Sequence, residues 1–400
     1  MRKPAWLFTL LAAAFVLYTD DYVIAGILPE LATDLHITEG HAGQLVTVFS
    51  LTVAITAPVA AIVLANVPRR QLFTTALLIF ITSNIAAATT KSFIVLTTLR
   101  VATALVAAAT TPALFAFTAQ HAPAHRVGRY IAAVSLGVTG SIAAGVPFGT
   151  WIGGILSWRA TFATMAIAGV VVLLLVRATL PRSEGKKETL RLTEQLRILW
   201  KAPISLGLLA NCLLMTGSMM MLTYLAPYLA ATTSAGIEER ALAFSLSGIA
   251  GIVGIWLGGI ATDRLGANLT LIIGIGTIIS TMLILWTLWT VRPAPLLAVL
   301  GIVTLWGAMA FWNSPAIQAR LHHLAAPVSG HALALNTSGT YLGVSIGAAA
   351  GGAVLTRGGV GLLPLTAAGF ATASLILLAI APSQSNTSTS NDTTGERPVP

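Results

Sequence analysis

The chain has 400 residues, of which 56% are hydrophobic and only 9% are charged, whereas about a quarter of the residues of an ordinary soluble domain are charged. This composition excludes a soluble globular protein and predicts a polytopic protein of the lipid bilayer. The formal net charge of +9 does not indicate a nucleic-acid partner, because the basic residues are spread over short segments between apolar runs rather than gathered on one face.

Apolar runs of about 20 residues, each long enough to cross about 30 Å of hydrocarbon as a helix, recur along almost the whole chain. We predict twelve spans, centred near residues 17, 53, 81, 106, 142, 170, 216, 250, 279, 306, 342 and 371. The first run has a basic start, but no convincing cleavage site follows it. It is therefore interpreted as a retained helix rather than a signal peptide.

The basic residues also predict the orientation of the chain. If the N-terminus is cytoplasmic, sixteen of the 22 Lys and Arg residues lie on the cytoplasmic side, five lie on the outer side, and Arg100 lies within a span. Cytoplasmic loops carry an excess of Lys and Arg, so both termini are predicted to be cytoplasmic. The expected location is the inner (cytoplasmic) membrane of a bacterium.

A polar, basic segment separates the first six spans from the last six. It predicts an N-terminal six-helix bundle at residues 1–180, a cytoplasmic linker at 181–201 and a C-terminal six-helix bundle at 202–382. Residues 383–400 are rich in Ser, Thr, Asn and Pro, with almost no apolar content, and are expected to form a disordered cytoplasmic tail.

Two adjacent carboxylates, Asp20 and Asp21, lie inside the first apolar run. A charged side chain at that depth costs about 2.5–3.5 kcal/mol on insertion scales, and it persists mainly where it faces a partner or a water-filled path. Successive helical residues lie about 100° apart, so the two acids cannot face the same direction. Asp21 is expected to face the cavity, and Asp20 a neighbouring helix or polar partner.

Arg100 is a predicted partner for these acids. Asp21 lies eight residues before Pro29, at the outer end of the first span, and Arg100 lies eight residues after Ser92, at the outer end of the fourth. At 1.5 Å per residue, both lie about 12 Å from the same surface, which predicts that Asp21 and Arg100 either pair or share access to a cavity. The alternative is a buried ion pair that only holds the first and fourth spans together.

Glycines recur every four residues in the fifth and eleventh spans. They are Gly145, Gly149 and Gly153 in the fifth span and Gly339, Gly343, Gly347 and Gly351 in the eleventh. This spacing puts each set on one helix face and allows close helix approach. Its occurrence six spans apart indicates a duplicated transporter with its site at the repeat interface, although simple helix packing also accounts for most of these glycines.

The loop after the eighth span, Gly259-x-x-x-Asp263-Arg264-x-Gly266, resembles the signature loop of the major facilitator superfamily. In that family the loop lies between the second and third helix of each half and latches the halves together on the cytoplasmic side.

The corresponding loop after the second span departs from the family pattern. It keeps Arg69 and Arg70 but has Ala65 and Asn66 where the family usually has Asp and Arg, and Pro68 where it has Gly. The cytoplasmic latch is therefore expected to be weakened in the N-terminal half.

Further segments are similar to one branch of this superfamily. Leu99-Arg100 resembles the intramembrane arginine motif, and the run from Gly145 through Pro147 and Gly149 to Gly153 resembles the antiporter motif of the drug-efflux branch. The segments 21–30, 158–162 and 335–352 are similar to the sugar-efflux and chloramphenicol-resistance group of twelve-span exporters. The resemblance covers residues 5–380 and implies an all-α fold of two pseudo-symmetric six-helix bundles around one alternately accessible site.

The resemblance implies a proton-coupled exporter of a small amphipathic drug or metabolite. The predicted proton-coupling residues are Asp21, with Asp20 and Arg100, because burial favours the neutral acid while a nearby arginine favours the carboxylate. The proton gradient replaces any cofactor, since the sequence has no phosphate-binding Gly-Lys-Ser/Thr loop. An enzyme and a metal site are not expected, and the expected functional unit is a monomer. The alternatives are efflux of a sugar or other metabolite, proton-linked uptake, or a sensor that does not transport.

Spans 1, 4, 7 and 10 are expected to line the cavity. Met and aromatic side chains adapt to apolar ligands, and buried amides need hydrogen-bond partners, although helix packing is the alternative for any single Met or Trp. The candidate substrate-binding residues are Tyr22, Asn211, Met215, Met219, Tyr224, Trp312, Asn313, Asn336 and Tyr341. The candidate gating or structural residues are Gly259, Asp263, Arg264, Gly266, Arg69, Arg70, Gly145, Pro147, Gly149 and Gly153.

Overall fold

The computed structural model describes residues 5–64, 66–123, 126–181, 202–324 and 329–380. Within these ranges, twelve segments are long and apolar enough to cross a membrane as helices. Each of the twelve predicted span centres falls inside one of them, so the predicted all-α fold of two six-helix bundles is confirmed. The predicted linker, apart from Pro181, and the predicted tail lie outside the described residues.

The N-terminal bundle is built from α1 (Ala5–Asp34), α2 (Glu39–Ala42), α3 (Gln44–Val63), α4 (Arg69–Thr89), α5 (Phe93–His121), α6 (Val127–Gly140), the π-helix η2 (Ser141–Gly145), α7 (Val146–Ile155) and α8 (Trp158–Thr179). The C-terminal bundle is built from α10 (Ala202–Thr223), α11 (Leu225–Thr233), α12 (Ile237–Leu265), α13 (Ala267–Thr290), α14 (Leu296–Leu324), α15 (Ser329–Gly358) and α16 (Leu362–Ile380).

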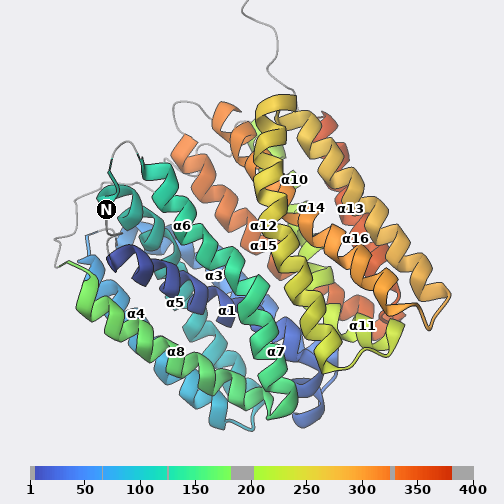
Figure 1. Ribbon diagram of the computed structural model, residues 1–400, viewed down its shortest axis with the longest axis horizontal. Coiled ribbons are helices and arrows are strands. Elements are labelled where there is room, and N and C mark those ends of the chain that lie inside the picture. The colour runs from blue at the N-terminus through green and yellow to red at the C-terminus, as the bar shows by residue number, and fades with distance from the viewer. Residues whose placement is uncertain (1–4, 65, 124–125, 182–201, 325–328, 381–400) are drawn as a thin grey trace, which may run out of the picture.

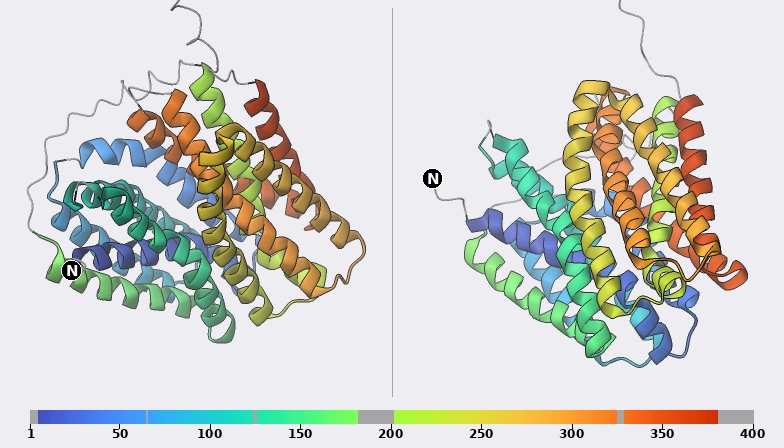
Figure 2. Two further views of the ribbon diagram at one scale, coloured as in Figure 1. Left: turned by 45° about the horizontal axis from the view of Figure 1, so that its top comes forward. Right: turned by 45° about the vertical axis from the view of Figure 1, so that its right-hand side comes forward.

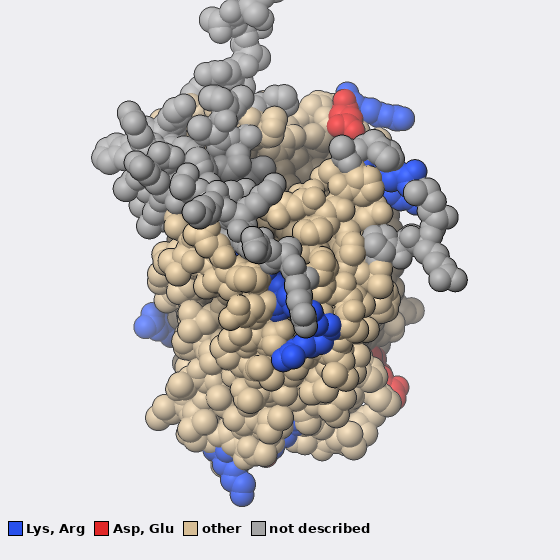
Figure 3. All heavy atoms as spheres, turned by 90° about the vertical axis from the view of Figure 1, so that its left-hand side faces the viewer, with Lys and Arg blue, Asp and Glu red and all other residues tan. Residues whose placement is uncertain are grey.

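The two bundles converge near α7 and α11 and diverge at the opposite end, where the first residues of α1 lie (Figures 1 and 2). We call these the outer end and the inner end. The main contacts between the bundles join α3 to α15, and η2 and α7 to α12. In Figure 3 most of the described surface on one side of the molecule is uncharged, with basic side chains in a few separate places, as expected for a protein that faces lipid.

Glycines on η2 and α7 bring these helices close to α1. A Cβ atom at any of three glycines, four residues apart, would lie 2.0–2.5 Å from a side-chain atom of α1. The contacting pairs are Gly145 with Thr19, Gly149 with Val23 and Gly153 with Ile27. The glycine spacing therefore fixes the position of the helix that carries both membrane acids.

The C-terminal bundle repeats this arrangement on α15 and α10. A Cβ atom at Gly343 would lie 2.4 Å from the carbonyl oxygen of Cys212, and one at Gly347 would lie 2.4 Å from that of Thr216. The fifth span thus packs on the first through glycines, and the eleventh packs on the seventh in the same way. This correspondence is the pseudo-symmetry of the fold at the level of individual residues.

The fifth span is not a continuous α-helix, because η2 interrupts it over five residues. Pro147, at the start of α7, has no backbone N–H, and it therefore removes the α-helical bond to the carbonyl of Ala143. A π-helical turn is one way in which a helix accommodates such a gap. The sequence motif contains the proline and the glycines, but it did not lead us to predict the π-helix.

Candidate functional site

Asp20 forms a buried ion pair with Arg100. The Nη1 atom of Arg100 donates a hydrogen bond to Oδ2 of Asp20 at 2.7 Å, and each side chain is 2% exposed. The guanidinium group of Arg100 also lies over the ring of Phe49, 4.4 Å from its centroid. The ion pair therefore links α1, α3 and α5 within the N-terminal bundle.

Of the two arrangements predicted for Asp21 and Arg100, the direct pairing of their side chains is wrong. Arg100 reaches Asp21 only through the backbone carbonyl, to which Nη2 donates at 3.5 Å. The depth calculated from the sequence placed Arg100 level with Asp20 and Asp21, but two adjacent residues of a helix differ in depth by only about 1.5 Å. The step of about 100° per residue determines which acid faces α5, and that acid is Asp20. The two carboxylates do face different directions, as this step requires.

Asp21 is joined to the other bundle. The hydroxyl of Tyr341, on α15, donates a hydrogen bond to Oδ2 of Asp21 at 3.1 Å, and both residues are buried. The ring of Tyr341 packs with Phe49 and Val53 of α3 in a small apolar cluster. Tyr341, which the sequence suggested as a substrate contact, is thus the described side-chain hydrogen-bond partner of Asp21 across the interface.

Two of the predicted amides meet between α10 and α15. The Nδ2 atom of Asn211 donates to Oδ1 of Asn336 at 2.9 Å and to Oγ1 of Thr340 at 3.1 Å. Thr340 directly precedes Tyr341 on α15, so this polar group lies at about the same membrane depth as the contact with Asp21. The sequence analysis missed Thr340, although polar residues four apart in an apolar span were a signal for it.

Met215, on α10, and Tyr22, directly after Asp21 on α1, are half-buried. Met215 is one turn beyond Asn211 on α10, and its Cβ atom lies 2.9 Å from a Cβ built at Gly343. Tyr22 stacks on Tyr18, with ring centroids 6.3 Å apart. These side chains add polarisable and aromatic surface to a polar centre.

Tyr224 and Met219 are placed in packing contacts rather than in this group. The hydroxyl of Tyr224 donates to the carbonyl of Ala348 at 2.8 Å, and a Cβ atom at Gly43 would lie 2.0 Å from that hydroxyl. Tyr224 therefore seals the interface between the bundles. Met219 is buried in the largest apolar cluster.

Trp312 and Asn313 face the interior of the C-terminal bundle. Trp312 donates through Nε1 to the carbonyl of Thr270 at 3.0 Å. Asn313 is 1% exposed and donates to the carbonyl of Met309, in its own helix, at 2.9 Å. In this conformation Tyr224, Met219, Trp312 and Asn313 make packing contacts, and their roles as substrate contacts stay predictions.

The outer end of the interface is closed by direct contacts between the bundles. Arg240 of α12 donates through Nη2 to Oε1 of Glu30 at 2.7 Å, in a pair that is largely buried. Ser345 donates to the carbonyl of Thr47 at 3.1 Å. The sequence analysis did not single out Glu30 and Arg240 as a pair.

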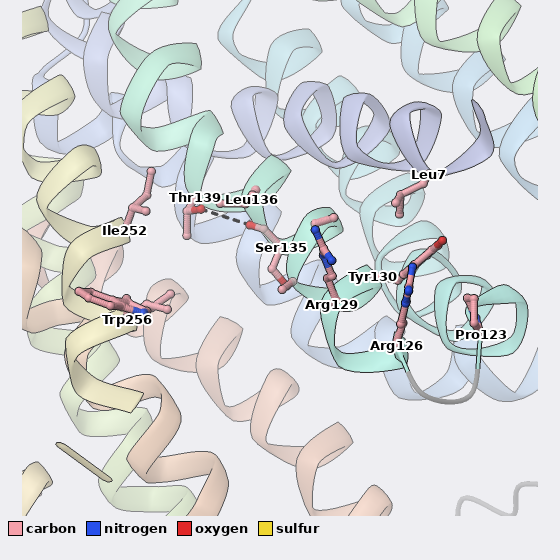
Figure 4. A pocket seen from close by; sticks show the side chains of 13 residues that line it. Leu7, Pro123, Arg126, Arg129, Tyr130, Ser135, Leu136, Thr139, Ile252 and Trp256 are labelled. Carbon is pink, nitrogen blue, oxygen red and sulfur yellow. Dashed lines mark hydrogen bonds between the residues drawn. The ribbon is translucent and has the colours of Figure 1, made fainter. Parts of the chain in front are cut away.

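The inner end is open between α6 and α12, which border a cavity of about 930 Å³ (Figure 4). In the signature loop, Asp263 and Arg264 are exposed, and neither takes part in an ion pair described for this part of the chain. Gly266 has φ +81°, a conformation suited to glycine between α12 and α13. Arg70 donates to the carbonyl of Arg177 within its own bundle.

Two six-helix bundles that enclose a buried polar centre, closed at one end and open at the other, define a membrane transporter. Residues 10–329 match the Major Facilitator Superfamily, and the chain belongs to this family. It is therefore a secondary transporter and not an enzyme.

Related proteins align with this chain over most of their length. The chain is 32% identical over 348 residues to the uncharacterized MFS-type transporter YbcL of Bacillus subtilis (strain 168), covering 86% of this chain and 87% of that protein. It is 28% identical over 374 residues to the inner membrane transport protein YdhP of Escherichia coli (strain K12), covering 93% and 94%. It is also 28% identical over 381 residues to a chloramphenicol resistance protein of Streptomyces lividans, covering 94% and 95%.

Among solved structures, the fold is similar to that of a D-xylose-proton symporter. The TM-score is 0.79 at 18% sequence identity, and the match covers 94% of this chain and 98% of the symporter.

Proposed function

We propose that the protein exports a small amphipathic drug or metabolite in exchange for protons. The observation that carries this proposal is the hydrogen bond between Asp21 and Tyr341, because it places a carboxylate without a described ion pair on the moving interface. The similarity to a chloramphenicol resistance protein supports a drug-like substrate. The similarity to an inner membrane transport protein supports the same location, and the excess of Lys and Arg in the loops on one side supports cytoplasmic termini.

In this mechanism the two acids have separate roles. Asp20 and Arg100 stay paired within one bundle, so that pair is retained as the bundles rock. Asp21 loses its hydrogen bond from Tyr341 when the outer end opens, because α1 and α15 belong to different bundles. The carboxylate then meets water from outside, and its changed surroundings allow it to take up a proton.

The proposed substrate subsite lies beside this proton site. Asn211, Asn336 and Thr340 supply hydrogen-bonding groups, while Met215 and Tyr22 supply apolar surface. A pocket that joins a few polar groups to adaptable apolar walls suits an amphipathic ligand. Because Thr340 and Tyr341 are consecutive residues of α15, a substrate that moves this helix is expected to affect the contact with Asp21.

One chain supplies both halves of this interface, and we therefore propose a functional monomer. The segment 181–201 is the proposed cytoplasmic connection between the bundles. The proposed energy source is the proton gradient, with no cofactor.

Transport by proteoliposomes tests the proposal. The purified protein is reconstituted, a pH gradient is imposed, and movement of chloramphenicol is followed, then that of other ligands found by thermal shift among drugs, sugars, nucleobases and amino acids. The native protein is expected to move its ligand against the proton flux, and Asp21→Asn is expected to abolish this coupling.

Asp34→Asn is the matched control, because Asp34 lies at the outer end of the same helix in a partly exposed pair with Arg159. It is expected to leave coupling intact. Coupling that survives Asp21→Asn would contradict the assignment of Asp21. Ligand movement in the same direction as protons would instead indicate uptake, and ligand binding without movement would indicate a sensor.

A further inference from the structure

The cavity between α6 and α12 has two chemically distinct parts. Leu136 of α6 faces Ile252 and Trp256 of α12 along an apolar stretch, while Arg126 and Arg129 lie at the inner end of the same cavity (Figure 4). Leu136 and Trp256 are 53% and 66% exposed. The cavity therefore combines an open apolar wall with a basic end.

The basic end has no described counter-charge. Neither Arg126 nor Arg129 takes part in an ion pair within the described residues. Arg126 precedes the first residue of α6, and the free N–H groups and positive end of a helix also favour anions. Two arginines and a helix N-terminus thus meet where an anionic group has access.

Aromatic side chains place this basic end at the membrane surface. The ring of Trp6 lies 5.8 Å from that of Tyr130 and 6.0 Å from that of His121, centroid to centroid. Trp and Tyr are enriched where lipid meets water, so Arg126 and Arg129 lie at the level of the lipid headgroups.

The cavity narrows from this level toward the membrane centre. A Cβ atom at Gly248 of α12 would lie 2.4 Å from the backbone of Ala143 in η2, so the two helices touch there. Leu7 of α1 also contributes to the lining. The result is a groove with a basic mouth at the inner surface and an apolar wall that runs into the membrane.

We propose that this groove binds an anionic phospholipid from the leaflet on the side of the chain termini. The phosphate is held by Arg126 and Arg129, and one acyl chain lies along Leu136, Ile252 and Trp256. Basic pockets between transmembrane helices on the cytoplasmic side bind acidic headgroups. A phospholipid fits this groove better than a free anion does, because a free anion would leave the apolar wall uncovered. Because the groove needs α6 and α12 apart, the lipid stabilises the conformation that is open at the inner end.

Native mass spectrometry of the full-length protein tests this binding site. The detergent-solubilised protein is titrated with dioleoylphosphatidylglycerol and, separately, with dioleoylphosphatidylcholine. The anionic lipid is expected to bind more tightly, and the double variant Arg126→Gln/Arg129→Gln is expected to weaken its binding about 30-fold, which corresponds to about 1 kcal/mol for each arginine. Binding of the zwitterionic lipid is expected to stay unchanged.

The control variant Lys91→Gln/Arg357→Gln also removes two positive charges, from exposed positions at the outer end. An equal loss in this control would overturn the proposal, because it would show a diffuse charge effect. So would equal binding of the two lipids, an unchanged affinity in the arginine variant, or displacement of the lipid by millimolar inorganic phosphate.

A second measurement keeps the test valid if the double variant does not fold. Cys212 is the only cysteine, so Cys212→Ser/Leu136→Cys accepts a single bimane label in the groove. The reference position is a bimane at Ile94→Cys, since Ile94 is 77% exposed near the outer end. Phosphatidylglycerol with a spin label on its acyl chain is expected to quench the bimane in the groove at lower lipid fractions than the bimane at this reference position. Equal quenching at the two positions would overturn the proposal.

Discussion

The two bundles share a packing scheme but differ in the groups they bring to the interface. Within the described residues, the N-terminal bundle carries Asp20, Asp21 and Arg100 at membrane depth, whereas Tyr341 and Asn211, buried in the C-terminal bundle, are neutral. The same glycine-based scaffold therefore supports a charged half and a neutral polar half. Under the proposed function, this difference teaches that proton exchange and ligand contact belong to different halves, so that coupling would depend on the contact between them.

The largest expected effect comes from the charged half. Arg100→Met leaves Asp20 as a buried charge without its partner, which costs about 3–5 kcal/mol. Arg159→Gln, at the partly exposed pair with Asp34, is the control, with an expected cost of about 0–1 kcal/mol. Thermal unfolding of the purified variants measures both. If Arg100→Met is no less stable than Arg159→Gln, the ion pair does not hold the N-terminal bundle together.

The next effect concerns the contact that crosses the interface. Tyr341→Phe keeps the ring but removes the donor to Asp21, and a hydrogen bond to a charged group is worth about 1.5–3 kcal/mol. We expect the population to shift toward opening at the outer end. Spin labels at Lys91→Cys and Arg357→Cys, in a Cys212→Ser background, measure this as longer distances.

Tyr130→Phe is the matched control for this experiment, since Tyr130 lies at the inner end within the N-terminal bundle. It is expected to leave the distance distribution unchanged. An unchanged distribution in Tyr341→Phe as well would mean that the hydroxyl contact does not contribute to closure.

A steric change tests the closure without altering charge. In Gly248→Ala the new methyl group meets the backbone of Ala143 in the other bundle, and overpacking of this kind costs about 1–3 kcal/mol. The same spin-label pair is expected to report separation of the bundles. Gly276→Ala, where the space is open, serves as the control. Identical distances in the two variants would show that the α12 contact yields without moving the bundles.

The smallest expected effect belongs to the neutral half. Asn211→Ala removes the amide that joins Asn336 and Thr340, and a neutral hydrogen bond is worth about 0.5–1.5 kcal/mol. Ligand affinity, measured by thermal shift, is expected to fall about fivefold, while ligand transport remains coupled to protons. Asn313→Ala, in the packing between α14 and α13, is expected to lower stability but not affinity. Loss of coupling in Asn211→Ala would argue against the division between the halves.

The sequence predicted the spans and their packing well, because length and apolar content determine which segments cross the membrane. The glycine spacing likewise predicted which faces of the fifth and eleventh spans allow close approach. These features depend on local spacing alone, and the structure places Gly145 and Gly343 in the expected close contacts.

The site was predicted only in part, for a physical reason. In a membrane, both the lipid-facing and the buried faces of a helix are apolar, so hydrophobicity did not show that Trp312 and Asn313 face α13. Depth located Arg100 beside the acidic doublet but did not resolve Asp20 from Asp21. Glu30 and Arg240 form a pair although more than two hundred residues separate them in the sequence. Nothing in the local sequence around either residue predicts that contact.

The π-helix in the fifth span has a consequence for helix register. Gly137 and Gly145 both contact α1, yet eight residues of regular α-helix turn through about 800°, which would leave the two glycines about 80° apart. A single π-turn absorbs about one residue, which reduces the offset to about 20° and returns both glycines to one face. Straightening the helix with all of its residues retained would thus turn Gly149 and Gly153 about 100° away from the helix that carries the two acids, whereas deleting one residue from 141–145 would leave them facing it.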